Sequence, residues 1–507
     1  MKSLTSKRGN NFLPRLLFLV GLIQVGLMCS ITSIGQSYDA NWILANGQLI
    51  VEFHEEEPNL HLTDSIFNTH LDNSCISDSE GALWFYANGC SVRGWDYAEI
   101  MNGDSLNPGA QTDLQCSGGN VATQGSLFIP SPGNPNHLYL LHMNLDFFPP
   151  YGAVGIEFFY SLIDVSDGVN VRIIEKNHLV YADTFAHALI SACRHANGRD
   201  WWLLIPEMAS NKWFRFLLDA NGLHGPWEQR VATVLGEDNG GGWVAFSEDG
   251  NFYARVDKFD NLHVLNFDRC SGLLSNHHYI KLPTIMPSLG NIRSLAFSPN
   301  SQLLYVNGPE FLYQFDLNAP SLQNSMQLVG AFDGYGDPHP GYFSRMKLAP
   351  DGKIYVFPGN SNFYLNVIHN PDKRGVDCNF VQHEFELPLR NYTYPPNIPN
   401  FKLGRMEGSP CDTLFVPPVT TAGCTTDDMQ VNPNPFEQEL FIRFDDCIIQ
   451  EGRFFLYDAL GRVIWEEDVH SSDIDHVISL PQLATGVYFY QIISEGKQLK
   501  SGKLLKY

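Results

Sequence analysis

Short apolar runs separated by tight polar turns dominate the middle of the chain, and one arrangement recurs at a constant spacing. Each copy is an apolar strand, a polar turn and a second apolar strand. The clearest copies cover residues 193–203, 246–254, 297–306 and 348–356. The last turn residues of these copies are Gly198, Gly250, Ser301 and Gly352. They follow one another after 52, 51 and 51 residues, which predicts stacked supersecondary units rather than one irregular core.

Two further copies have turns near Gly81 and Asn136, so that six hairpins are visible. A second apolar pair follows the later copies and includes residues 262–268, 311–317 and 363–368. Each repeat therefore supplies about four strands, the content of one β-propeller blade. Residues 40–403 have the length of seven such repeats, so seven blades are favoured and six are the alternative. A seventh blade is expected to take strands from both ends of the domain. Asn46-Gly47 between two apolar runs is a separate hairpin signal at the start.

The composition and the hydrophobic periodicity of the chain change after residue 403. Residues 404–430 are rich in proline and threonine and have little periodicity, which is typical of a linker. Residues 431–507 contain short apolar runs about ten residues apart with turn signals between them, which predicts a small Ig-like β-sandwich. The expected fold class is all-β, a β-propeller at residues 36–403 followed by this sandwich.

The first 35 residues have the pattern of a secretory signal peptide. A basic start is followed by the apolar run 16–28 and by the small residues Ser33 and Gly35 near a cleavage site. The apolar run is too short for a convincing membrane span, and no later segment has the length needed to cross a bilayer. We therefore expect an exported mature chain, from residue 36, without a transmembrane segment.

Several sequence segments of the repeat are also distinctive in their residue order. The most distinctive lie at 297–306, 311–317, 195–202 and 397–401. They resemble the YVTN/WD-repeat-like propellers of secreted bacterial proteins, over most of residues 40–403 but less clearly in the first third. The resemblance implies the fold and no particular reaction, because this scaffold hosts many activities.

Four phrases stand in order near the C-terminal end, at 432–436, 457–463, 483–489 and 503–507. They closely resemble the C-terminal sorting domain, type A, of the type IX secretion system of certain Gram-negative bacteria. By this resemblance, the sorting-signal residues include Asn432, Pro433, Asn434, Pro435, Gly461, Gly486 and Tyr488. The resemblance implies that the signal peptide takes the chain to the periplasm. The outer-membrane machinery would then read the sorting domain and remove it, and the propeller would be released or anchored at the cell surface.

Charge and motifs exclude several classes of function. The formal net charge of −23 repels phosphate backbones, so nucleic acid is not an expected partner. The sequence contains no H-E-x-x-H, G-x-S-x-G or Walker A motif and no dinucleotide fingerprint between a strand and a helix. No catalytic residues are therefore assigned.

The sequence contains only weak signals for a metal site or for an aromatic binding site. His277 and His278 are adjacent, so in a strand they would point to opposite faces and would not easily share a metal. The loop 333–337 contains two aspartates and two glycines and is the one place where calcium is considered, although a solvated loop is favoured. No other cofactor is expected. Five tryptophans crowd one third of the propeller and either pack between blades or face the axial mouth: Trp201, Trp202, Trp213, Trp227 and Trp243.

Ten cysteines are present, and export permits disulfides. Cys75 with Cys90 would close a hairpin, and Cys411 with Cys424 would staple the linker. None of the cysteines has the C-x-x-C spacing of a zinc site.

These observations lead to one favoured hypothesis and two alternatives. The favoured one is an exported β-propeller that binds a glycan or protein ligand, delivered by the type IX secretion machinery. The first alternative is a polysaccharide lyase or glycosidase with its site in the axial funnel, which needs converging acidic and basic groups. The second is a surface-structural or motility-associated component. Converging charged groups in an open axial pocket would favour an enzyme, and a plugged axis would favour binding or a structural role.

Overall fold

The computed structural model describes most of the chain after the predicted signal peptide. The described residues are 37–53, 57–69, 71–148, 152–166, 168, 170–231, 242–257, 261–283, 293–336, 339–412, 429–444, 452–459, 461–469, 475–494 and 497–506. The signal peptide, residues 1–35, lies outside them and stays a prediction.

The described residues before residue 412 form seven antiparallel sheets, each built from strands that are consecutive in the chain. Two of these sheets have three strands. They consist of β1 (Asn41–Leu44), β2 (Leu49–Glu52) and β3 (Asn59–Leu62), and of β4 (Ser74–Ser77), β5 (Leu83–Ala87) and β6 (Val92–Gly94). The hairpin signal at Asn46-Gly47 connects β1 to β2, and Gly47 adopts a φ of +80° there.

The other five sheets have four strands each, in the order of the chain or its reverse. The third sheet contains β7 (Ser126–Pro130), β8 (His137–Phe148), β9 (Gly152–Asp164) and β10 (Arg172–Phe185). The fourth contains β11 (Ser191–Arg194), β12 (Trp201–Pro206), β13 (Lys212–Asp219) and β14 (Gly222–Arg230). The fifth contains β15 (Gly242–Phe246), β16 (Phe252–Asp257), β17 (Asn261–Phe267) and β18 (Leu274–Lys281).

The sixth sheet contains β19 (Ser294–Phe297), β20 (Leu303–Asn307), β21 (Phe311–Asp316) and β22 (Gln327–Ala331). The seventh contains β23 (Phe343–Leu348), β24 (Ile354–Pro358), β25 (Asn362–Ile368) and β26 (Phe380–Asn391). Within the described ranges, helical structure is limited to short pieces in the connections, namely α1 (Ala110–Gln115), η1 (Cys116–Gly118), η3 (Gln323–Ser325) and η4 (Gly375–Cys378).

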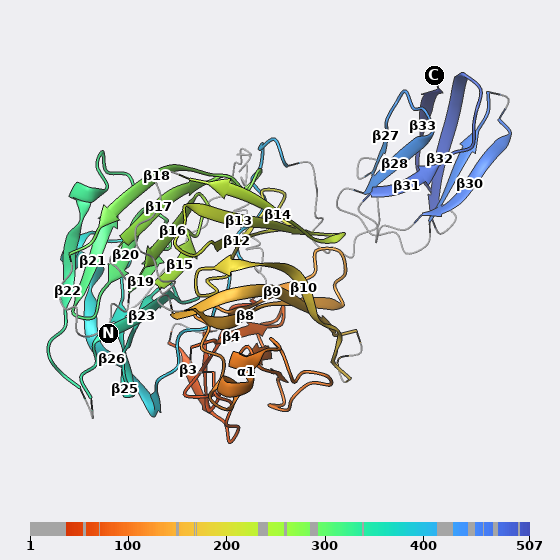
Figure 1. Ribbon diagram of the computed structural model, residues 1–507. Helices are drawn as coiled ribbons and strands as arrows, with labels where there is room; N and C mark the ends of the chain where they lie inside the picture. Colours follow the sequence, from red (N-terminus) through yellow and green to blue (C-terminus); the bar gives the residue numbers. More distant parts are fainter. Residues whose placement is uncertain are drawn as a thin grey trace, which may run out of the picture. The chain divides into compact units, whose positions relative to one another are not determined.

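The first strands of the seven sheets are neighbours around a common centre. β1 contacts β4, β4 contacts β7, β11 contacts β15, β15 contacts β19, and β19 contacts β23. A bridge between Thr123 and Ala188 links the entries of β7 and β11. The circle closes where the ring of Trp42 in β1 packs against Tyr355 of β24, with 5.7 Å between centroids. The sheets follow one another in chain order from orange through green to cyan (Figure 1), so the domain is a seven-bladed β-propeller.

The expected exchange of strands between the two ends of the domain is wrong. Every blade is made of consecutive strands, and the first blade is the hairpin at Asn46-Gly47 with one added strand. Blades 1 and 2 have only three strands, and blade 1 is short, because β1 at Asn41 begins only 33 residues before β4 at Ser74, whereas the repeat of the later blades is about 52 residues. Seven blades consequently fit without a shared sheet.

The predicted turns of the recurring hairpin are confirmed. Their last residues all adopt positive φ: Gly198 at +78°, Gly250 at +71°, Ser301 at +57° and Gly352 at +79°. Serine hydroxyls close two of these turns, because Ser247 Oγ accepts the Phe252 N–H at 2.9 Å and Ser298 Oγ accepts the Leu303 N–H at 3.0 Å. In blades 4 to 7, the period of the sequence is therefore the spacing between turn residues that adopt a left-handed conformation.

Alternate residues of an inner strand pack against different neighbouring blades. Trp243 of β15 belongs to a cluster with Leu295 and Leu304 of blade 6. The next residue, Val244, belongs to a cluster with Trp213 of blade 4. Successive side chains of a strand point to opposite faces of the sheet, so a blade that is buried on both faces packs them against different neighbouring blades.

One fully buried carboxyl group connects blades 2 and 3. Asp72 Oδ1 accepts the Ser126 hydroxyl at 2.6 Å, and Asp72 Oδ2 accepts the Asn120 amide at 3.3 Å. Burial raises the pKa of the Asp72 carboxyl to about 7, against the lowering effect of these hydrogen bonds. The folded protein therefore holds this proton more tightly than the unfolded chain does.

We expect the substitution Asp72→Asn to change how stability depends on pH. Because the pKa is raised on folding, the contribution of Asp72 to stability is lost as the pH rises from its unfolded value towards 7. From pH 5 to pH 8, the free energy of unfolding of the variant should gain about 2–3 kcal/mol relative to the wild type. Urea unfolding at both pH values measures this difference. The exposed Asp113→Asn is the matched control, and an equal gain in both variants would contradict the assignment.

The disulfides differ from the predicted pairs. Cys90 pairs with Cys116, and Cys270 pairs with Cys411, while Cys75 is a buried free thiol. Cys90 pairs with Cys116 because the connection after β6 brings residue 116 next to the turn between β5 and β6. Cys411 lies against blade 5, where it pairs with Cys270, rather than in the linker. Cys424 lies outside the described residues. Residues 404–412, which the sequence assigns to the linker, are thus held on the propeller.

The last described part is a sandwich of two antiparallel sheets. One sheet has the order β27 (Met429–Asn432), β28 (Glu439–Phe444) and β31 (Asp475–Ser479). The other has the order β30 (Val463–Val469), β29 (Gly452–Tyr457), β32 (Gly486–Ser494) and β33 (Lys497–Lys506). Both sheets contribute to one core that includes Met429, Leu440, Ile442, Phe454, Leu456 and Ile492. The predicted small β-sandwich is confirmed.

Candidate functional site

The chain itself occupies the centre of the propeller. Residues 391–404, here called the axial segment, begin at the last residue of β26 and run along the inner strands. Tyr394 lies near the start of these strands, with its ring 6.5 Å from that of Trp243 and the Arg345 guanidinium 4.5 Å above it. Phe401 lies near their ends, with its ring 5.5 Å from that of Trp201. The axial segment therefore follows the axis from one mouth of the ring to the other.

Asn397 is the central anchor of the axial segment. Its backbone N–H donates to Asn73 O at 2.7 Å, and its side-chain amide donates to Ser126 O and Ile190 O, both at 3.0 Å. Its side-chain oxygen accepts the Gln124 amide at 3.3 Å. One buried asparagine thus joins the inner strands of blades 2, 3 and 4, and its hydrogen-bonding groups are used within the ring.

Three further contacts continue towards the far mouth. Lys347 Nζ donates to Ile398 O at 2.9 Å, and the Asn400 amide donates to Glu248 O at 2.9 Å. Lys402 Nζ lies 3.2 Å from a carboxylate oxygen of Asp39. The axial segment is therefore fixed to blades 5 and 7 as well as to the residues that precede β1.

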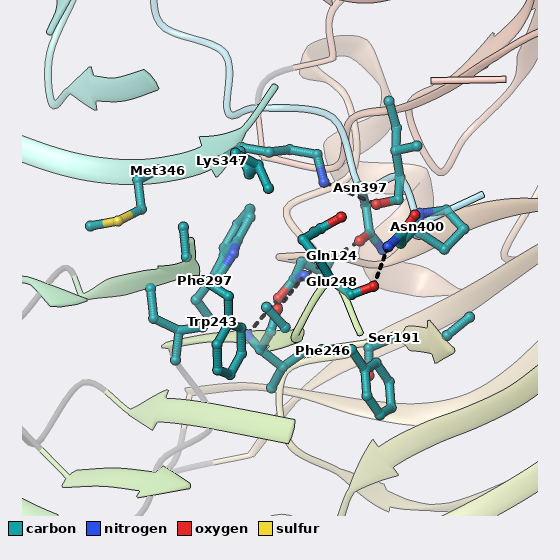
Figure 2. A pocket seen from close by; sticks show the side chains of 18 of the residues that line it. Gln124, Ser191, Trp243, Phe246, Glu248, Phe297, Met346, Lys347, Asn397 and Asn400 are labelled. Atoms are coloured by element: carbon teal, nitrogen blue, oxygen red, sulfur yellow. Dashed lines mark hydrogen bonds between the residues drawn. The ribbon is translucent and has the colours of Figure 1, made fainter. Parts of the chain in front are cut away.

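A small cavity remains beside the axial segment (Figure 2). Its volume is about 90 Å³. The apolar part of its wall includes Trp243, Phe246, Phe297 and Met346, and the polar part includes Gln124, Ser191, Glu248, Lys347, Asn397 and Asn400. Small-molecule sites usually measure about 300–1,000 Å³, so this space suits a few water molecules rather than a substrate.

Glu248 and Lys347 are the ionisable groups of this cavity. Burial raises the pKa of the Glu248 carboxyl to about 7, although the Lys347 ammonium opposes the rise. Burial also lowers the pKa of Lys347, and the charge of Glu248 opposes that change. A second cavity of about 60 Å³ at the adjacent mouth is lined by both side chains and by Asp39 and Lys402. Two carboxyl groups and two amines therefore converge at one end of the axis.

The tryptophans that the sequence singled out have two different fates. Trp201, Trp202, Trp213 and Trp243 are buried, and only Trp243 lines the axial cavity. Trp227 is 44% exposed on β14. Packing between blades therefore accounts for most of them, and an exposed tryptophan on blade 2, Trp95, was missed by the sequence analysis.

The residues considered for metals make other contacts. His277 Nε2 lies 2.9 Å from Nδ1 of the buried His263, and their rings stack. Asp333, in the loop considered for calcium, pairs with His383 at 2.9 Å, and Asp337 lies outside the described residues. Within the described ranges, no group of three or more His, Cys, Asp or Glu residues is placed to hold a metal ion. The calcium hypothesis stays a prediction.

The residues predicted for sorting lie in three places on the sandwich. Asn432 is the last residue of β27, and Pro433 to Pro435 follow it; the Asn434 side chain donates to Lys503 O and accepts the Leu505 N–H, both at 2.9 Å. Gly461 forms the β29–β30 turn with a φ of +78°. Gly486 pairs with Lys506, and the Tyr488 hydroxyl donates to Ala484 O at 2.7 Å. The structure brings the Asn434 segment and the last strand together.

Sequence comparison identifies the tail. Residues 430–506 match the family described as secretion system C-terminal sorting domain. The predicted type IX sorting domain is confirmed, and the chain is exported to the cell surface or secreted. No curated protein matches the chain significantly in sequence. None of the helices in the described ranges is long and apolar enough to span a membrane.

Solved structures are similar at low identity. A functionally unknown protein from Desulfotomaculum acetoxidans is 12% identical, with a TM-score of 0.38, over 71% of this chain and 98% of that one. The Cps50 (Swd1) β-propeller domain of Myceliophteria thermophila is 10% identical, with a TM-score of 0.34, over 64% of this chain and 93% of that one. Such identities carry nothing about activity.

Proposed function

We propose that this chain, which carries a type IX sorting domain, is a binding module that its export places on or outside the cell. The seven-bladed propeller is the functional part, and the sorting domain delivers it through the outer membrane. The ligand is a glycan or a protein, and contact is made on the outer surfaces of the blades rather than in the axis.

The filled axis is the observation that carries this proposal. Propeller enzymes need an open funnel in which substrate reaches converging acidic and basic groups. Here the axial segment occupies that place, with Asn397 bonded to three blades, and the remaining cavity measures about 90 Å³. This supports a rigid scaffold that presents its surface to a partner.

One observation favours a second candidate, a polysaccharide lyase or glycosidase. Glu248 has a pKa of about 7 and shares the 60 Å³ mouth cavity with Asp39 and Lys347. A carboxyl group that titrates near neutral pH suits general acid or base catalysis, and glycosidases use two carboxyl groups. For this function the axial segment would have to leave the mouth when substrate enters.

The two candidates separate in one experiment on the exported protein. A panel of polysaccharides is assayed for new reducing ends and for unsaturated products, and the same panel is arrayed to measure binding. We expect binding without turnover, unchanged in Glu248→Gln. Turnover that is lost in Glu248→Gln would contradict the binding module and support the enzyme. The absence of both binding and turnover, with no protein partner captured on the cell surface, would favour a structural component.

A further inference from the structure

A groove of about 340 Å³ lies at the outer strands of blades 2 and 3. One wall is the turn after β6, residues 94–101, and the other is formed by Gly168, Asn170 and Val171, which precede β10. Phe85 of β5 and Ile100 are buried beneath it. Its volume falls within the range of about 300–1,000 Å³ that is usual for small-ligand sites, unlike the axial cavity.

The wall of the groove is fixed before any ligand arrives. The turn is closed by a hydrogen bond from Gly94 N to Ala98 O at 2.9 Å. At its end, Met101 N donates to Val171 O at 3.3 Å and Met101 O accepts the Ile173 N–H at 3.0 Å. The turn of blade 2 is thus bonded to blade 3, and the groove needs little ordering when it binds.

The chemistry of the groove is aromatic and acidic. Trp95 is 61% exposed and Met101 is 59% exposed, whereas most other tryptophans of the propeller are buried. Asp96 and Glu99 also line the groove, and within the described ranges neither has an ion-pair partner, although Asp96 Oδ1 accepts the Ala98 N–H at 3.1 Å. The described lining residues include neither lysine nor arginine. The described lining residues therefore include one exposed tryptophan and two acidic residues, and none of them is a cation.

We propose that this groove binds one pyranose ring of a neutral glycan, which rests on the proposed binding function and gives it a site. The indole face of Trp95 stacks on the C–H face of the sugar. The carboxylates of Asp96 and Glu99 accept hydrogen bonds from its hydroxyl groups, and such charge-assisted bonds are stronger than neutral ones. Anionic sugars and phosphates are repelled, because the groove carries negative charge alone in a chain of net charge −23.

The test uses the exported protein and an array of neutral, amino-substituted and acidic glycans, followed by titration of the strongest neutral glycan. We expect Trp95→Ala to weaken that binding by roughly tenfold or more and Trp95→Phe to keep part of it. Glu99→Gln should weaken it by several-fold, because a neutral amide is a weaker acceptor. Trp227→Ala is the matched control, since Trp227 is an exposed tryptophan outside the groove, and it should bind as the wild type does.

The outcomes separate the site from the function. Neutral glycan binding that depends on Trp95 and not on Trp227 supports the proposal. Binding that is unchanged in Trp95→Ala overturns the site and leaves the binding module standing. A preference for amino-substituted glycans that is lost in Trp95→Ala overturns the neutral ligand. A protein that captures a protein partner but no glycan overturns the glycan proposal alone, and one that binds neither overturns the proposed function as well.

Discussion

Replacement of Asn397 by leucine is expected to lower the free energy of unfolding by about 3–5 kcal/mol. The two side chains have the same number of heavy atoms and the same branching, so the change chiefly removes hydrogen bonds, although the methyl groups of leucine are bulkier than the amide. The carbonyl groups of Ser126 and Ile190 lose their donor, and the Gln124 amide loses an acceptor. Each buried polar group left without a partner costs about 1–3 kcal/mol.

Urea unfolding of the chain from residue 36, followed by tryptophan fluorescence, measures this effect. Asn221→Leu is the control, because Asn221 is exposed in the turn between β13 and β14. We expect a change of less than about 0.5 kcal/mol for this surface substitution. Equal stability of the two variants would show that the axial segment is not a part of the propeller core.

Deletion of residues 429–507 is expected to abolish export past the outer membrane. These residues contain the match to the sorting domain and fold around a core of their own, so the propeller strands stay intact when they are removed. The truncated chain should accumulate in the periplasm as a folded propeller. The full chain should reach the cell surface or the medium.

Immunoblots of the periplasm, the cell surface and the medium from the native host test this prediction. A chain that keeps the sandwich but carries Asn221→Leu is the control and should be exported normally. Asn434→Ala should reduce export less than the deletion does, because it removes two hydrogen bonds to the last strand and leaves the core in place. Truncated chain at the surface in normal amounts would contradict the role of the tail.

The repeat could be predicted from the sequence because its cause is local. A tight turn needs a residue that tolerates positive φ, and Gly198, Gly250, Ser301 and Gly352 supply it at equal spacing. Ser247 and Ser298 add hydrogen bonds within five residues of themselves. Local causes leave local patterns, and their period together with the length of residues 40–403 favoured seven blades. The Asn46-Gly47 hairpin was equally visible, and it turned out to be the blade that the period alone did not reveal.

The pairings between distant residues could not be predicted. Cys270 and Cys411 are separated by 141 residues, and nothing in their neighbourhoods distinguishes them from the other cysteines. Closure of the ring depends on Trp42 and Tyr355, two aromatic residues in ordinary strand positions more than three hundred residues apart. Such contacts follow from the assembled fold and leave no spacing that a single sequence displays.

The candidate sites show the same limit. In the sequence, Asn397 is only one residue of the segment 397–401, because its three hydrogen bonds to blades 2, 3 and 4 depend on where the axial segment lies. In the sequence, Glu248 is an ordinary turn residue. Its raised pKa is caused by burial, which becomes visible only in the structure. Trp95 stands in a short polar turn that carries no periodic signal, so its exposure appears only when β6 is seen at the edge of its sheet.

The most direct test of the account is hydrogen exchange of the backbone amide of Asn397 in the exported protein. In the structure this N–H donates to Asn73 O at 2.7 Å inside the ring. The account predicts that it exchanges as slowly as the inner strands do, only when the propeller unfolds as a whole. Exchange within seconds, while the inner strands stay protected, would contradict the claim that the chain fills its own axis.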